Sequence, residues 1–256
     1  MKVARKVLIV VLFLVDALVF SIMYMADTNT YKAKDIDIYL TQLTMYDCLH
    51  DGYNTNEYPS ITIDNNENIW IEPCKEDLKG SGVVFYPGAY VDPLSYLPIM
   101  YNLARAGYVT CISTMSYSLA FFSINSADNV INNPKYKDLN WYIGGHSLGG
   151  VAASMYYFKN SDKLKGLILL ASYSTKDLTG LNSAKVLSIY GTNDKVLSLD
   201  AYNKNKKNLV NLKEYVIEGA NHAQFGSYGE QKGDGKAEIR PETQWFWTAY
   251  YIVNFI

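Results

Sequence analysis

Beyond residue 30, short apolar runs alternate along the chain with segments whose apolar residues recur at helical spacing. Continuous apolar runs are typical of strands that are buried on both faces of a parallel sheet. The alternation therefore predicts an α/β fold, with a mostly parallel central sheet and helices on both of its faces. The predicted strands are Val83–Tyr86, Tyr108–Ser113, Trp141–Gly144, Gly166–Ala171, Val186–Tyr190 and Glu214–Ile217, and the predicted helices are Ser95–Ala106, Ala127–Asn132, Val151–Phe158 and Pro241–Phe255.

Two earlier segments show a different pattern. Polar and apolar residues alternate at Asp35–Leu40 and at Asn68–Ile71, and a turn signal lies near residues 64–66. A period of two is typical of a strand with one face buried. We therefore expect both segments to form antiparallel strands at the edge of the sheet, within one domain that covers residues 31–256.

The N-terminal segment, residues 1–30, is predicted to lie outside this domain as a membrane anchor. Lys2, Arg5 and Lys6 precede an apolar run from Val7 to Met25, which is just long enough to cross a bilayer core of roughly 30 Å. Asp16 in its middle costs about 2.5–3.5 kcal/mol, whereas roughly a dozen Leu, Ile, Val and Phe residues contribute about −0.3 to −0.6 kcal/mol each. The positive flank predicts a single-pass protein whose domain lies outside the cytoplasm.

A cleaved signal peptide, which would give a secreted protein, is the alternative reading of this segment. Met23 and Tyr24 precede Ala26, and they match a small-x-small cleavage site poorly. The sequence thus favours the uncleaved anchor and leaves cleavage open.

Composition limits the remaining possibilities. The 256 residues carry a net charge of −2, so no basic surface indicates nucleic-acid binding. Three cysteines do not make a disulfide framework, and no His/Cys cluster indicates a metal; no cofactor is expected. Cys111 falls in a predicted strand and is expected to be buried. Cys48 and Cys74 could pair in an oxidising compartment, and the sequence leaves that open.

The candidate chemistry begins at Gly145-His146-Ser147-Leu148-Gly149, which fits G-x-S-x-G between a predicted strand and a predicted helix. In this nucleophile elbow a serine occupies a sharp, strained turn, and small residues on either side let the strand and helix approach. The hydroxyl then lies at the positive end of a helix. The pattern predicts Ser147 as a nucleophile.

A serine nucleophile needs a base, and the base needs an acid that fixes its tautomer. His222 follows the last predicted strand, at the carboxyl edge where α/β sheets carry their sites. Asp194 follows the preceding strand, so the chain order Ser147, Asp194, His222 is the order found in folds that carry a nucleophile elbow. Glu218 is the alternative acid, although it lies on the same strand end as the histidine.

Two backbone N–H groups are needed to bind an oxyanion. Leu148, the residue after the nucleophile, is one expected donor. Ala89, in the loop after the Val83–Tyr86 strand, is the other, because Pro87 has no N–H and Gly88 allows close approach.

From about Asp35 onward the chain resembles the α/β-hydrolase superfamily, specifically small bacterial members without a lid that are related to dienelactone hydrolases. The resemblance implies Ser147, Asp194 and His222 as the catalytic triad. Pro87-Gly88 stands where many members have His-Gly, so only the backbone role of this loop is implied. The segments that carry the resemblance are Phe85–Pro93, Gly144–Gly150, Tyr190–Asp194, Gly219–Gly226 and Tyr228–Gly235.

These features predict a membrane-anchored serine hydrolase that cleaves small carboxylic esters or thioesters through an acyl-enzyme. An acyltransferase with the same triad, and a catalytically silent domain that binds a partner, are the alternatives. The connection between Ala171 and Val186 is too short for a lid, which predicts an open site. The stretch Gln231–Gly235 suggests a tight loop in which Asp234 bonds a backbone group. Aromatic residues that could either rim the site or pack in the core are Tyr90, Phe121, Phe122, Phe225 and Tyr228.

Overall fold

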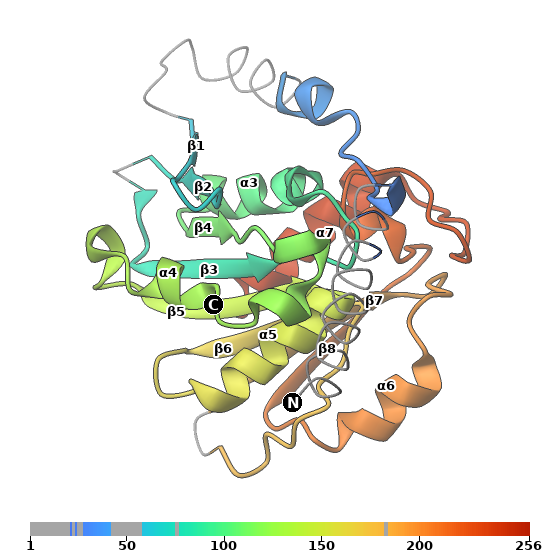
Figure 1. Ribbon diagram of the computed structural model, residues 1–256. Helices are drawn as coiled ribbons and strands as arrows, with labels where there is room; N and C mark the ends of the chain where they lie inside the picture. The colour runs from blue at the N-terminus through green and yellow to red at the C-terminus, as the bar shows by residue number, and fades with distance from the viewer. Residues whose placement is uncertain (1–20, 22–23, 25–27, 42–57, 75–76, 182–183) are drawn as a thin grey trace, which may run out of the picture.

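The computed structural model describes residues 21, 24, 28–41, 58–74, 77–181 and 184–256. In this part of the chain, eight strands form one sheet in the order β1-β2-β4-β3-β5-β6-β7-β8 (Figure 1). The strands are β1 (Ser60–Ile63), β2 (Ile69–Glu72), β3 (Ser81–Tyr86), β4 (Val109–Ile112), β5 (Asn140–His146), β6 (Gly166–Leu170), β7 (Val186–Gly191) and β8 (Leu212–Ile217).

The sheet is parallel from β4 to β8, and β1 and β2 extend it as antiparallel strands. From β3 the chain first crosses to β4 on one side and then returns to β5 on the other. Open α/β sheets bind ligands outside the carboxyl ends of the strands at such a point of reversal. The topology therefore predicts a ligand site at the loops that follow β3 and β5.

Helices cover both faces of the sheet, as the sequence predicts. Helices α3 and α7 pack on one face, and α4 and α5 pack on the other. Alternate residues of β3 separate accordingly: Val83 and Phe85 belong to the first core, and Val84 and Tyr86 to the second. The helices are α3 (Leu97–Arg105), α4 (Ala127–Ile131), α5 (Leu148–Lys159), α6 (Leu199–Lys206) and α7 (Pro241–Val253).

The strand predicted at Asp35–Leu40 is wrong, because residues 36–41 are helical. Ile38, which the alternating pattern placed on the buried side with its neighbours, is 58% exposed. Ile36, Tyr39 and Leu40 instead pack against the core that contains α3 and α7. Their spacing of three and four residues fits one face of a helix. The edge of the sheet is formed by β1, and a turn at residues 64–67 connects it to β2.

The predicted membrane anchor lies outside the described residues, apart from residues 21 and 24. Among the residues that the structure does describe, no helix has the length and apolar character needed to cross a bilayer. The anchor therefore stays a prediction.

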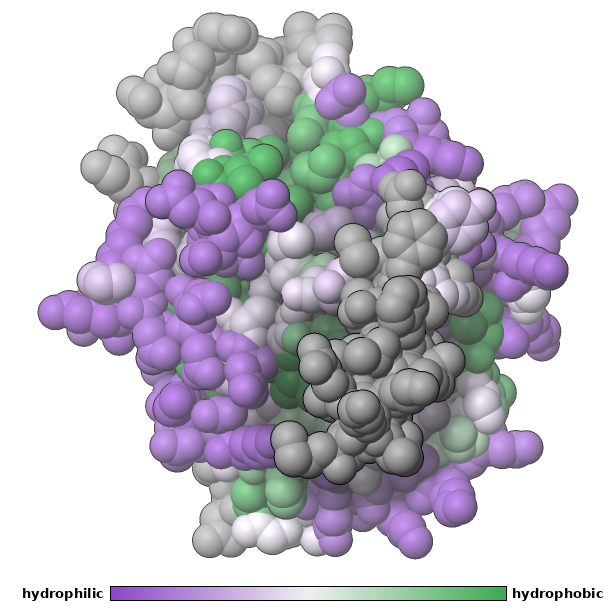
Figure 2. Space-filling view, viewed as in Figure 1, coloured by the Kyte–Doolittle hydropathy of each residue, from purple (hydrophilic) through white to green (hydrophobic). Residues whose placement is uncertain are grey.

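Hydrophilic residues dominate the left and right margins of the face shown in Figure 2, and a hydrophobic group lies toward its top.

The connection between β6 and β7 consists of turns and bends in its described residues, with no helix among them. This agrees with the short connection expected from the sequence.

Candidate active site

Ser147 lies between β5 and α5 with φ 52° and ψ −123°. A non-glycine residue in such a conformation costs about 1–3 kcal/mol and persists only where its surroundings hold it. Here the Ser147 N–H donates to the carbonyl of Leu170 at 2.9 Å, and Ser172 Oγ donates to the carbonyl of Ser147 at 2.7 Å. The strained turn is thus held from β6 and the loop after it.

Glycines make this turn possible. A Cβ on Gly145 would lie 2.5 Å from the carbonyl carbon of Gly149, and a Cβ on Gly149 would lie 2.2 Å from the carbonyl oxygen of Pro87. A Cβ on Gly150 would lie 2.5 Å from Ser172 Oγ. All three close approaches require glycine, and the strand–turn–helix context expected around Ser147 is present.

His222 follows β8 and Asp194 follows β7. His222 Nδ1 lies 2.9 Å from Asp194 Oδ2, and each side chain is only 1% exposed. The other carboxylate oxygen, Oδ1, accepts the N–H groups of Val196 at 2.9 Å and Leu197 at 2.8 Å. Because a carboxylate only accepts hydrogen bonds, His222 donates from Nδ1, and its Nε2 is left free to accept a proton.

The alternative acid is placed differently. Glu218 is exposed, and its carboxylate makes no hydrogen bond to any residue that the structure describes. Of the two candidates, only Asp194 is hydrogen-bonded to His222.

A second histidine lies beside the pair. The rings of His146 and His222 have centroids 4.5 Å apart, which places the elbow next to His222. Burial, and the charge that His222 can carry, hold the pKa of His146 well below its usual value of 6.5. His146 is therefore neutral at pH 7. Its Nδ1 lies 2.9 Å from the hydroxyl of Tyr96, which is itself fully buried.

The loop after β3 lies directly against the elbow, because β3 pairs with β5 in a register that ends at Tyr86 and Gly145. Gly88 donates its N–H to Tyr96 Oη at 2.9 Å. The next N–H group, that of Ala89, donates to none of the described residues, and neither does that of Leu148 at the start of α5. The two groups expected to bind an oxyanion are thus without partners in the described structure.

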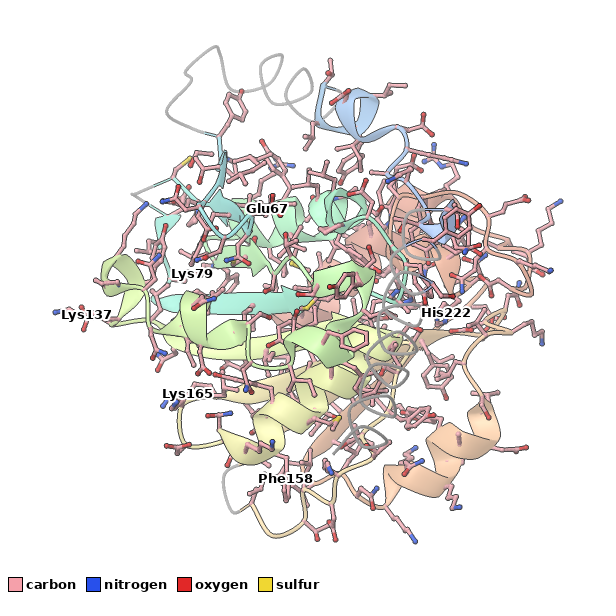
Figure 3. The ribbon with its side chains drawn as sticks, in the orientation of Figure 1. Glu67, Lys79, Lys137, Phe158, Lys165 and His222 are labelled. Carbon is pink, nitrogen blue, oxygen red and sulfur yellow. The ribbon has the colours of Figure 1, made fainter. Side chains whose placement is uncertain are left out.

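These groups gather at the carboxyl ends of the parallel strands. Figure 3 shows His222 at the opposite end of the strands from three lysines that precede β3, β5 and β6, namely Lys79, Lys137 and Lys165. No hydrogen bond joins Ser147 to His222 in the described structure, and His222 Nε2 is buried without a partner. The structure therefore brings the candidate base and the candidate acid together and leaves His222 Nε2 without a hydrogen bond.

Two residues near this site were not recognised from sequence. Tyr96 was considered only as part of the predicted helix Ser95–Ala106, and its contact with His146 spans 50 residues of sequence. Asp234 was expected only to bond a backbone group, and it bonds three. Asn193 and Asn221, the residues before Asp194 and His222, also bond the loop that contains Asp234.

The five aromatic residues named from sequence divide into two groups. Phe225 and Tyr228 are fully buried and belong to the core with α3 and α7. Phe121 and Phe122 are exposed by 44% and 56%, and Tyr90 is half-buried. Core packing therefore accounts for the first two.

The structure describes two of the three cysteines, Cys74 and Cys111. Cys111 is buried in β4, as expected, and burial raises the pKa of its thiol. Cys48 lies outside the described residues, so its pairing with Cys74, which the sequence leaves open, stays open. No cluster of His, Cys, Asp and Glu among the described residues could hold a metal ion.

Comparison with known families identifies the chain. Residues 82–246, which make up more than half of it, match the model of the alpha/beta hydrolase family. The chain belongs to this family. A search of curated proteins found no match for this alpha/beta hydrolase.

Solved structures share its fold at low sequence identity. Est1E from Butyrivibrio proteoclasticus has a TM-score of 0.56 and 14% identity, over 77% of this chain and 98% of Est1E. Dienelactone hydrolase from Anabaena variabilis has a TM-score of 0.56 and 16% identity, over 77% of this chain and 98% of the relative. A structure of Est1E with ferulic acid bound has a TM-score of 0.54 and 15% identity, over 80% and 96% of the two chains.

Proposed function

We propose that this alpha/beta hydrolase is a serine hydrolase that cleaves small carboxylic esters or thioesters through an acyl-enzyme. The observation that carries the proposal is the buried hydrogen bond between Asp194 and His222, located beside the strained Ser147 turn. A buried carboxylate that fixes the tautomer of a histidine with a free Nε2 is the arrangement that activates a serine.

In this mechanism His222 Nε2 accepts the proton of the Ser147 hydroxyl while Oγ attacks the carbonyl carbon. The N–H groups of Ala89 and Leu148 bind the resulting oxyanion, and Asp194 stabilises the imidazolium. The tetrahedral intermediate expels an alkoxide or thiolate, which takes the proton from His222. Water then attacks the acyl-enzyme by the same sequence, which releases the acid and restores Ser147.

The missing Ser147–His222 hydrogen bond is compatible with this role, since catalytic hydrogen bonds are often long without substrate and tighten when it binds. The substrate class is supported by fold relatives, one named a dienelactone hydrolase and another solved with ferulic acid, a carboxylic acid. The described residues between β6 and β7 form turns and bends and no helix, and this short connection supports a small acyl substrate that enters directly.

The test of this function is turnover of p-nitrophenyl acetate or butyrate by the purified protein, together with covalent labelling by a fluorophosphonate probe. The Ser147→Ala variant should show neither.

We further propose that the protein is held in the cell membrane by Val7–Met25, with the hydrolase domain outside the cytoplasm. The apolar run after Lys2, Arg5 and Lys6 supports this location. Full-length protein should stay in the membrane fraction through high-salt and carbonate washes, and protease added outside cells stripped of their wall should digest the domain. A mature N-terminus near Asp27 would instead show a cleaved signal peptide, and protection from protease would reverse the orientation.

A further inference from the structure

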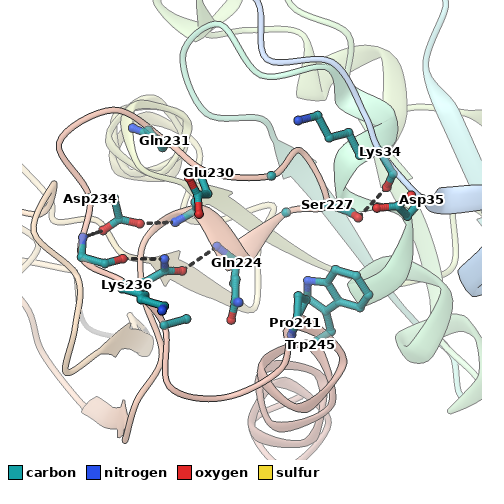
Figure 4. Close-up of a pocket in the computed structure, with 16 residues that line it drawn as sticks. Lys34, Asp35, Gln224, Ser227, Glu230, Gln231, Asp234, Lys236, Pro241 and Trp245 are labelled. Carbon is teal, nitrogen blue, oxygen red and sulfur yellow. Dashed lines mark hydrogen bonds between the residues drawn. The ribbon is translucent and has the colours of Figure 1, made fainter.

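Asp234 lies in a loop, residues 231–236, that folds back over the segments carrying His222 and Asp194. Its Oδ2 accepts the N–H of Ala223 at 2.8 Å, and its Oδ1 accepts the N–H groups of Lys195 at 3.2 Å and Gly235 at 2.8 Å. Ala223 is the residue after His222, and Lys195 is the residue after Asp194. One carboxylate therefore binds the backbone next to His222 and next to Asp194. Figure 4 shows Asp234 and its hydrogen bonds within the loop and toward the His222 segment.

The same loop also binds the residues that precede the base and the acid. Asn221 Nδ2 donates to the carbonyl of Gly235 at 2.8 Å, and Asn193 Nδ2 donates to the carbonyl of Lys236 at 3.0 Å. His222 and Asp194 are thus each flanked, before and after, by a hydrogen bond to one short loop.

Close packing fixes the position of this loop. A Cβ on Gly235 would lie 2.0 Å from the carbonyl oxygen of Asn193, so the loop backbone contacts the acid loop directly. Hydrogen bonds to a carboxylate are charge-assisted and stronger than neutral ones. The loop therefore opposes separation of the Asp194 segment, which follows β7, from the His222 segment, which follows β8.

Proton transfer from serine depends on the position of the base. A displacement of about 1 Å at a reacting group can lower the rate about 100-fold, and functional side chains need a supporting shell of hydrogen bonds to stay in place. The two loops share backbone contacts, in which the Asn193 N–H donates to the carbonyl of Ala220 at 2.9 Å and the Gly219 N–H donates to Thr192 Oγ1 at 2.8 Å. The Asp194–His222 bond of 2.9 Å joins the side chains themselves. Asp234 adds a connection that binds the residue directly after each of them.

We propose that Asp234 is a positioning residue, which holds the Asp194 and His222 loops at the separation that proton transfer requires. This inference rests on the proposed serine-hydrolase function. It assigns a role to a residue that touches neither the substrate nor the reacting atoms.

The test compares full-length wild type with Asp234→Ala, Asp234→Asn and the control Glu230→Ala. Glu230 is an exposed acid near the start of the same loop, and its carboxylate bonds no described residue. Asp234→Ala should lower kcat about 10- to 100-fold per fluorophosphonate-reactive molecule, with KM nearly unchanged. Asp234→Asn keeps one acceptor oxygen and should recover part of that loss, while Glu230→Ala should match wild type.

The split between kcat and KM separates positioning from a structural role, because a protein that is only less stable has fewer active molecules but the same kcat in each of them. The inference is overturned if kcat per reactive molecule matches wild type, even where Asp234→Ala melts earlier. Failure of wild type itself to react with the probe would refute the proposed function instead.

Discussion

The hydroxyl of Tyr96 lies 2.9 Å from Nδ1 of His146, the residue immediately before Ser147. The same hydroxyl oxygen accepts the N–H of Gly88. Because Tyr96 is fully buried, its own proton goes to His146 Nδ1, the acceptor within reach. One phenol therefore connects the nucleophile elbow with the loop that presents the N–H of Ala89.

Tyr96→Phe should destabilise the protein and slow it. The substitution leaves the N–H of Gly88 and Nδ1 of His146 buried without a partner, which costs about 1–3 kcal/mol for each unsatisfied group. The Ala89 N–H loses its fixed direction, so kcat should fall about 10-fold, within the range for a weakened oxyanion donor. Urea unfolding and ester turnover measure the two effects.

The control for this change is Tyr250→Phe, because Tyr250 is 48% exposed and no hydrogen bond from its hydroxyl is found in the described structure. It should match wild type in both measurements. If Tyr96→Phe kept the stability and the kcat of wild type, the Tyr96 hydroxyl would contribute neither to the stability of the elbow nor to the position of the Ala89 N–H.

His146 should make stability depend on pH below 6.5. Burial lowers its pKa in the folded protein, so the unfolded chain takes up a proton there that the folded protein does not. The stabilisation is therefore present above about pH 6.5 and is lost as pH falls, by at most about 1.4 kcal/mol per unit for this group. The free energy of unfolding from urea titrations between about pH 7.5 and 5 should fall more steeply in wild type than in His146→Gln. Parallel curves for the two proteins would contradict the burial of a neutral His146.

Much of the fold follows from local pattern. The parallel strands were predicted because each is a short apolar run between turn signals, and two such runs, Gly166–Leu170 and Val186–Gly191, are almost fully buried. The helix at residues 36–41 was not predicted, because Ile36, Ile38 and Leu40 fit the period of two that is typical of a strand. In the structure, Tyr39 is the residue of this segment that is buried against the core. Only the contact of this helix with the core decides between the two patterns.

Some residues of the candidate site follow from local sequence, and others follow only from contacts between distant segments. The Ser147 turn is encoded by neighbouring glycines, and the candidate base and acid by their places after the last two strands, so sequence alone could identify them. Tyr96 and Asp234 act through contacts with segments far from them or in other loops. A tyrosine in an apolar stretch and an aspartate in a glycine-rich loop have ordinary structural explanations, so only the three-dimensional contacts point to the roles proposed for them.

The two candidate acids can be separated directly. Asp194→Asn should lower kcat about 10⁴-fold, because an amide in place of the carboxylate no longer fixes the tautomer of His222. Glu218→Gln should leave turnover within about twofold of wild type, since surface substitutions far from such contacts change little. Steady-state kinetics of both variants, with circular dichroism to confirm folding, make the comparison. A larger loss in Glu218→Gln than in Asp194→Asn would move the acid to Glu218.

The most direct test of the proposed function is covalent labelling of Ser147. Purified full-length wild type should react with a fluorophosphonate probe and hydrolyse p-nitrophenyl butyrate, because His222 activates the hydroxyl and the Ala89 and Leu148 N–H groups bind the oxyanion. Mass spectrometry should place the adduct on Ser147, and a folded Ser147→Ala variant should neither label nor turn over. Labelling retained in Ser147→Ala, or a well-folded wild type that neither labels nor hydrolyses the ester, would contradict the proposal.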